Sequence, residues 1–71
     1  MYNLSDLETY IAVVENRGIN AAAQMLKVSP ATVSLRLSKL EQALSTVLVF
    51  RDSRKLKLSP EGEIFYQQVG T

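Results

Sequence analysis

The residues of this sequence that could do chemistry are mostly basic, and they cluster. From Lys27 to Lys57 the chain carries seven Lys and Arg residues against two acidic residues, a local charge of +5, whereas the whole 71-residue chain has a net charge of +1. A contiguous basic segment favours contact with a polyanion. The same segment could instead be a solvated lysine-rich face, and charge alone does not separate the two interpretations.

Catalytic and metal-binding chemistry find little support in the residue types. The sequence has no histidine and no cysteine. A nucleophile–base pair could therefore be built only through a lysine, and a zinc site only from carboxylates. The neighbouring acids Glu61 and Glu63 are typical of charges at the start of a helix. We therefore predict a domain that is not an enzyme and that holds no cofactor.

The length of the chain allows one small domain. No apolar run approaches the roughly 20 residues that cross a membrane. The N-terminus carries Asp6 and Glu8 and lacks the basic region of a signal peptide. We expect a cytoplasmic domain without membrane contact, and a chain that is the N-terminal piece of a longer protein.

The first helix is predicted from its cap and its spacing. Asn3 can cap it while Asp6 reaches back to the cap residue. An apolar stripe follows at Leu4, Leu7, Ile11 and Val14. We expect this helix to end near Gly18, with Gly18 at positive φ, and a short second helix to begin with Asn20 as its cap.

A serine and a proline then interrupt the helical pattern. Ser29 is a good cap and Pro30 suits the first position of a helix, while Pro30 also keeps Ser29 out of the helical region. The turn is therefore short, Lys27 to Ser29, and the third helix runs from Pro30 to about Leu44. Two helices joined in this way form a helix-turn-helix.

The third helix has a buried and an open side. Val33, Leu37, Leu40 and Leu44 form one stripe at spacings of three and four. The opposite side, which we call the outer face, carries Ala31, Leu35, Ser38 and Gln42, flanked by Thr32, Ser34 and Lys39, with Arg36 nearer the core. Small and polar side chains of this kind suit close entry into a groove.

A basic hairpin, which we call the wing, is predicted next. The β-branched and aromatic residues 46–51 favour one strand and the alternating residues 56–59 a second. Ser59 and Pro60 repeat the cap-plus-proline signal and begin a last helix. We predict a mainly α fold, a winged helix-turn-helix of three helices, a two-stranded wing and the start of a linker helix. The domain covers residues 1–58 and the linker residues 59–71. An ordinary three-helix core is the alternative.

In this order, three stretches resemble the LysR-type transcriptional regulators. They are LETYIAVVE (residues 7–15), INAAAQMLKVSPATVSLRLSKLE (residues 19–41) and LVFRDSRKLKLSPEG (residues 48–62). The resemblance implies a bacterial regulator whose N-terminal domain binds double-stranded promoter DNA as a homodimer, commonly within a tetramer. A C-terminal domain outside this sequence would sense a small-molecule co-inducer.

Candidate DNA-binding residues come partly from charge and position and partly from the resemblance. The resemblance implies base or phosphate contacts for Ser29, Pro30, Ala31, Ser34 and Leu35, a phosphate contact for Asn20, and a minor-groove contact for Arg54. Charge and position add Lys27, Thr32, Arg36, Ser38, Lys39, Arg51, Lys55 and Lys57. In the last helix, Ile64, Phe65 and Val69 form either a dimer seam or a surface that packs back onto the first helix. A winged-helix protein-interaction module without DNA binding is the alternative function.

The sequence also departs from the family pattern. Leu35 stands where the family commonly has Arg, the usual reader of guanine; leucine can make only apolar contact, for instance with a thymine methyl group. The glutamine that often accompanies Pro30 is missing. The wing aromatic is shifted by one place to Phe50, which in a strand reverses its face. Ser45 replaces the glycine expected after the third helix.

Overall fold

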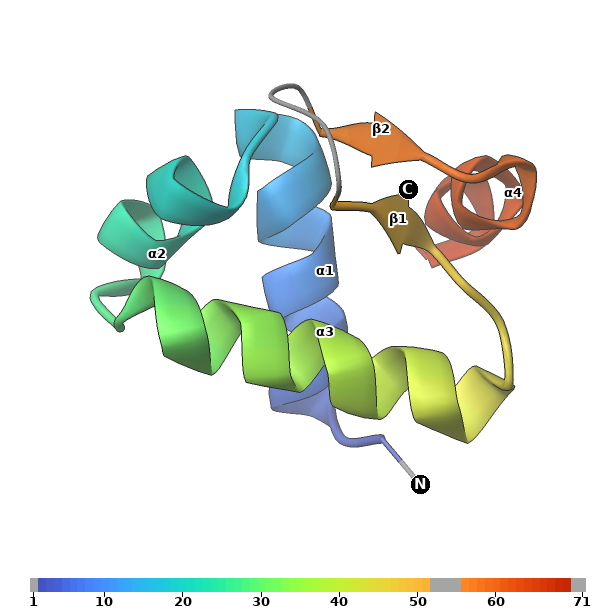
Figure 1. The fold of residues 1–71 in the computed structure, drawn as a ribbon, viewed down its shortest axis with the longest axis horizontal. Helices are drawn as coiled ribbons and strands as arrows, with labels where there is room; N and C mark the ends of the chain where they lie inside the picture. Colours follow the sequence, from blue (N-terminus) through green and yellow to red (C-terminus); the bar gives the residue numbers. More distant parts are fainter. Residues whose placement is uncertain (1, 52–55, 70–71) are drawn as a thin grey trace.

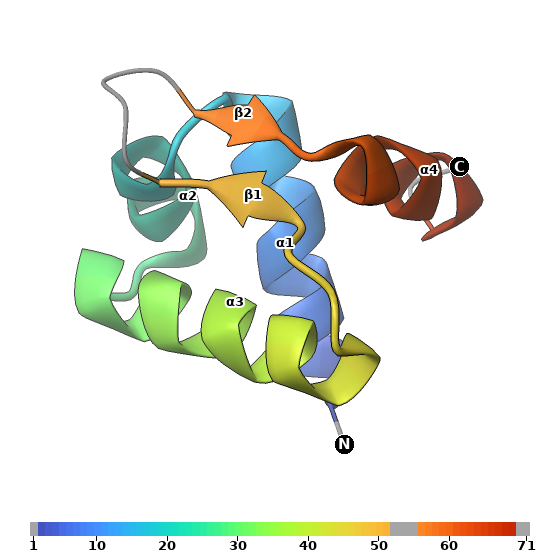
Figure 2. The same ribbon diagram turned by 45° about the vertical axis from the view of Figure 1, so that its right-hand side comes forward.

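The computed structural model describes residues 2–51 and 56–69 of the chain. Its elements are α1 (Leu4–Asn16), α2 (Ile19–Leu26), α3 (Pro30–Leu44), β1 (Val49–Phe50), β2 (Lys57–Leu58) and α4 (Pro60–Val69). Figure 1 shows α3 crossing α1, with α2 at one end of the molecule and α4 at the other, and Figure 2 shows the same order. The predicted fold class is confirmed.

The core lies where α1, α2 and α3 meet, and the start of the wing closes it. Its buried apolar residues are Tyr10, Ala12, Val13, Ala22, Ala23, Val33, Leu37, Leu40, Leu48 and Val49. The predicted stripe of α3 is confirmed at Val33, Leu37 and Leu40, and Leu44 is half-buried. Because Ala22 and Ala23 are small, α2 can approach its neighbours closely.

The predicted stripe of α1 is wrong at Leu4, while Leu7, Ile11 and Val14 are half-buried and the deepest burial lies on an adjacent side of the helix. Leu4 is 69% exposed, and the fully buried side of the helix holds Asp6, Thr9, Tyr10, Ala12 and Val13. Polar groups can be buried when they are hydrogen-bonded, and these are. The Thr9 hydroxyl donates to Ser5 O over 2.7 Å, and the Tyr10 hydroxyl donates to Gly62 O over 2.6 Å.

The start of α1 agrees with the prediction, whereas the end of α1 and the start of α2 depart from it. The capping box of Asn3 and Asp6 is confirmed. α1 ends with Arg17 in the left-handed region at φ 57°, whereas Gly18 is extended at φ 170°. Gly18 rather than Asn20 caps α2, because the helix already begins at Ile19 and places Asn20 in its first turn.

The turn before α3 forms as predicted. Ser29 caps the helix, since its hydroxyl oxygen accepts from Thr32 N over 3.1 Å, and Pro30 takes the first helical position. Lys27 turns the chain at φ 61°, and Val28 is half-buried against the core. Ser45 ends α3 in the left-handed conformation at φ 52°.

The wing strands are shorter than predicted. Val49 pairs with Leu58 and Phe50 with Lys57 in an antiparallel ladder. Val49 is buried and Phe50 is 44% exposed, so the shifted aromatic lies on the outer side of the wing while valine fills the inner side. Residues 52–55, which include the predicted contacts Arg54 and Lys55, lie outside the described residues.

α4 begins at the Ser59 cap and packs against α1. The Ser59 hydroxyl oxygen accepts from Gly62 N over 2.9 Å, and the rings of Tyr10 and Phe65 lie 5.6 Å apart, centroid to centroid. The domain boundary between residues 58 and 59 stays a prediction. None of the helices in the described part of the chain is long and apolar enough to cross a membrane.

Candidate nucleic-acid interface

The outer face of α3 is open. Ala31, Leu35 and Gln42 are exposed, Leu35 to 62%, and Ser38 is half-exposed. Ser29, Pro30 and Lys39 are also exposed, while Thr32, Ser34 and Arg36 are partly buried along the flanks. The structure therefore brings Ala31, Leu35 and Ser38 together opposite the buried stripe, with the other predicted contacts of α3 at its start and along its flanks.

Hydroxyl groups meet at the N-terminus of α3. Ser29 Oγ and Thr32 Oγ1 lie 2.9 Å apart, and Ser29 Oγ also accepts from Thr32 N. The two hydroxyls thus contact one another, and Ser29 satisfies one backbone N–H group of the first turn, that of Thr32. Both hydroxyl groups lie near the surface, next to the outer face of α3.

Two of the predicted cations on α3 point toward α1. The Arg36 guanidinium donates to Thr9 Oγ1 over 3.3 Å, and Lys39 Nζ lies 4.0 Å from Asp6 Oδ2. The Lys39 side chain is still 50% exposed. The third predicted cation near α3, Lys27 in the turn before the helix, is exposed.

A carboxylate that sequence reasoning missed ties the wing to α3. Glu41 Oε2 accepts from Leu48 N over 2.8 Å and from Val49 N over 3.2 Å. Glu41 Oε1 accepts from Arg51 Nη2 over 2.8 Å. Arg51 Nη1 also donates to Ser38 Oγ over 3.3 Å. In the sequence, Glu41 is visible only as an acidic residue next to the core residue Leu40, and this position does not indicate its partners in the wing.

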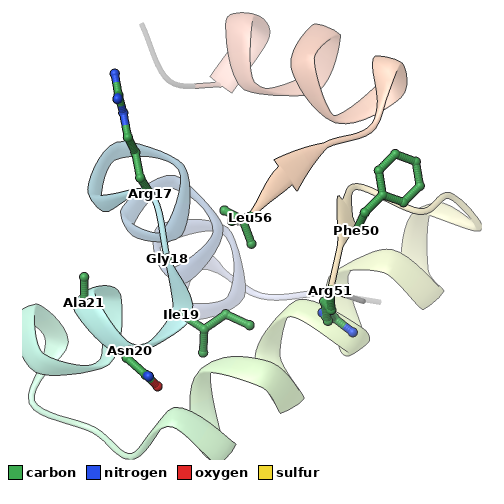
Figure 3. A pocket seen from close by; sticks show the side chains of 8 residues that line it. All are labelled: Arg17, Gly18, Ile19, Asn20, Ala21, Phe50, Arg51 and Leu56. Carbon is green, nitrogen blue, oxygen red and sulfur yellow. The ribbon is translucent and has the colours of Figure 1, made fainter. Parts of the chain in front are cut away.

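The wing and the start of α2 enclose a cavity of about 380 Å³. Its lining residues are Arg17, Gly18, Ile19, Asn20, Ala21, Phe50, Arg51 and Leu56. The structure thus brings the predicted contacts Asn20 and Arg51 to one cavity, together with Arg17, which the sequence had not indicated. In Figure 3 the Arg17 guanidinium extends away from the other side chains of the cavity.

The predicted dimerisation residues of α4 do not share one environment. Ile64 is 59% exposed, Val69 is half-buried, and Phe65 packs on Tyr10 of the same chain. A groove of about 280 Å³ lies beside Ile64. Its other lining residues are Leu44, Thr46, Leu48, Glu61, Phe65 and Gln68.

Burial raises the pKa of Tyr10 to about 12, and the carboxylates of Glu41 and Glu63 act in the same direction. Among residues 2–51 and 56–69, no cluster of three His, Cys, Asp or Glu side chains could hold a metal ion.

Comparison with known proteins gives the family. Residues 4–63 match the model of the bacterial regulatory helix-turn-helix proteins of the lysR family. The chain is 42% identical over 64 residues to the HTH-type transcriptional regulator DmlR of Escherichia coli, covering 90% of this chain and 21% of DmlR. It spans about a fifth of the length of the curated relatives it matches.

Solved structures agree in fold. The BenM DNA-binding domain in complex with the benA site 1 DNA superposes with a TM-score of 0.88 at 36% identity, covering 93% of this chain and 74% of that one; BenM is a regulator from Acinetobacter baylyi. Full-length AphB of Vibrio cholerae gives a TM-score of 0.90 at 34% identity, covering 96% and 23%. The open face of α3, the wing fastened to it and these matches lead to one conclusion: the chain belongs to the lysR family of bacterial regulatory helix-turn-helix proteins.

Proposed function

We propose that this domain binds double-stranded promoter DNA and recognises its sequence, with α3 in the major groove and the wing along the backbone or minor groove. The observation that carries the proposal is the outer face of α3, which is open, small and mostly polar. The major groove is wide enough to admit a helix, and the second helix of a helix-turn-helix enters it with its N-terminal residues on the bases. The likeness to a DNA-binding domain bound to DNA supports it.

Affinity and specificity would come from different residues. The basic residues would contact phosphates and so set the salt dependence of binding; they are Lys27, Lys39, Arg51, Arg54, Lys55 and Lys57. Thr32, Ser34, Leu35 and Ser38 would face the base edges. Asn20, in the first turn of α2, would meet a phosphate beside the wing.

The longer protein would act as a dimer or tetramer. Ile64 is the most exposed of the three candidate dimerisation residues, and pairing of two α4 helices through it would place two copies of α3 on one face of the DNA. The two half-sites would then lie whole helical turns apart. A small-molecule co-inducer would bind a part of the protein other than this domain.

Salt-dependent binding to genomic DNA fragments tests the proposal. Fluorescence anisotropy should give an affinity that falls linearly on a log–log plot as salt rises. Lys27→Gln should weaken binding to every fragment and flatten that slope by about one. Ser34→Ala should keep the slope and reduce the preference for the best fragment. Binding that is absent, or that does not respond to salt, would favour the protein-interaction module.

A further inference from the structure

We propose that Leu35, together with Ala31, reads the methyl groups of thymines in the major groove, so that the half-site presents T·A pairs to the first turns of α3. This inference rests on the proposed DNA binding and adds the class of base that α3 recognises. It concerns the one position of the outer face where a large apolar side chain projects into solvent.

Leu35 and Ala31 form an apolar patch at the place where a recognition helix meets bases. Residues four apart lie next to each other on a helix, with Cβ atoms about 5–6 Å apart. Both side chains are exposed, and both lie opposite the buried residues Val33 and Leu37. A single exposed leucine needs no explanation in general, but this one occupies the centre of the proposed contact surface.

Several polar side chains of α3 that could compete with the patch already have partners, whereas the partly buried Ser34 stays beside the patch as a second base contact. Within α3, all of which the structure describes, Arg36 donates to Thr9 of α1. The Glu41 carboxylate holds the wing. Lys39 lies near Asp6 and more than two turns from Pro30.

At the start of the helix, the Ser29 and Thr32 hydroxyls contact each other. Apart from the guanidinium of Arg36, the first two turns of α3, Pro30 to Leu37, carry no guanidinium and no side-chain amide.

This surface favours thymine through apolar contact and disfavours bases whose polar atoms would lose water without gaining a hydrogen bond. In the major groove thymine alone presents a C5 methyl group, whereas guanine presents two acceptors and cytosine an amino donor. When Leu35 packs against a thymine methyl group, apolar surface of both the side chain and the base is removed from water. Leu35 over guanine or cytosine would strip water from polar atoms without offering a hydrogen bond.

Replacement of thymine by deoxyuridine, which removes only the C5 methyl group, tests the assignment. Duplexes are first selected by the wild-type domain from a randomised library. Each thymine of the selected duplex is then replaced by deoxyuridine in turn. At one or two positions the wild type should lose affinity by about fourfold per methyl group. Leu35→Ala should bind the thymine and deoxyuridine duplexes equally at the position that Leu35 contacts, whereas a position contacted by Ala31 should keep its preference for thymine.

Two further variants complete the test. Leu4→Ala removes another exposed leucine, 69% exposed at the start of α1, and should keep the full thymine preference. Leu35→Arg should shift selection at the same position toward guanine, the usual partner of arginine.

The inference is overturned if binding is salt-dependent and sequence-selective but no deoxyuridine position depends on Leu35. If no duplex is selected and binding does not depend on salt, the proposed function itself fails, and the inference fails with it. If the Leu35→Ala domain binds every duplex as the wild type does, the inference is also overturned, and contact of Leu35 with a protein partner is favoured instead.

Discussion

Glu41 on α3 and Arg51 at the end of β1 form an ion pair with 2.8 Å between Oε1 and Nη2. The other carboxylate oxygen of Glu41 accepts two backbone N–H groups, those of Leu48 and Val49. One side chain thus fixes both the backbone that enters the wing and the first cation of the wing. The position of the wing relative to the outer face of α3 depends on this carboxylate.

Substitution of Glu41 should separate these contributions. Glu41→Ala leaves two backbone donors and a guanidinium without their acceptor, and should lower the free energy of unfolding by about 2 kcal/mol. Glu41→Gln keeps an amide oxygen for the backbone donors and should cost less. Arg51→Ala removes a partly exposed ion pair and a long, exposed hydrogen bond to Ser38, and should cost under about 1 kcal/mol. Urea unfolding measures all three, and an Arg51→Ala cost equal to that of Glu41→Ala would contradict the role given to the backbone contacts.

Local signals in the sequence were enough to place the starts of α1, α3 and α4, and with α3 the helix of the candidate site. The Asn3 and Ser29 caps, Pro30 at the first helical position and the stripe of Val33, Leu37 and Leu40 all depend on residues close together in the chain. The outer face of α3 follows directly from that stripe, because a helix that buries one side exposes the other.

Long-range contacts explain what the sequence did not show. Tyr10 can be buried with its hydroxyl satisfied because that hydroxyl donates to Gly62 O, 52 residues away, a partner that the spacing of apolar residues in α1 does not show. The role of Glu41 likewise depends on where the wing returns to α3. Neither partner is visible in a periodic pattern.

Ser45 offers a stabilising substitution. It holds the left-handed conformation at φ 52°, which costs a residue with a side chain about 1–2 kcal/mol and costs glycine little. Ser45→Gly should therefore raise the free energy of unfolding by about 1 kcal/mol. Ala43→Gly, two residues earlier within the helix, should lower it by about the same amount. Thermal unfolding of both variants checks the pair; a destabilised Ser45→Gly domain would refute the prediction.

Gly62 should not tolerate any side chain. A Cβ atom at this position would lie 2.2 Å from Leu48 O and 3.1 Å from the Tyr10 hydroxyl. Backbone rather than a flexible side chain blocks the space, so Gly62→Ala should cost about 3 kcal/mol and push α4 away from α1. Gly18→Ala is the matched control, because nothing lies within 4 Å of its Cβ position and its extended φ suits any residue; it should cost under about 1 kcal/mol. Equal costs for the two variants would show that the crowding at Gly62 is relieved by a small shift.

Tyr10 should make the domain sensitive to alkaline pH. Its pKa is raised from 10.0 to about 12, first by burial and then by Glu41 and Glu63. Between these two values the unfolded chain loses the tyrosine proton while the folded chain keeps it, so the folded state binds more protons. The stability that Tyr10 contributes is therefore fully present below pH 10 and is lost as the pH rises toward 12.

The variant Tyr10→Phe isolates this effect. It removes the hydrogen bond to Gly62 O and should be less stable than the wild type by about 1 kcal/mol at pH 8. Above pH 10 its free energy of unfolding should fall less steeply than that of the wild type, because phenylalanine has no phenolic proton to lose. Urea unfolding at several pH values between 8 and 11.5 gives the two slopes, and parallel slopes would mean that Tyr10 ionises equally easily in the folded and unfolded chains.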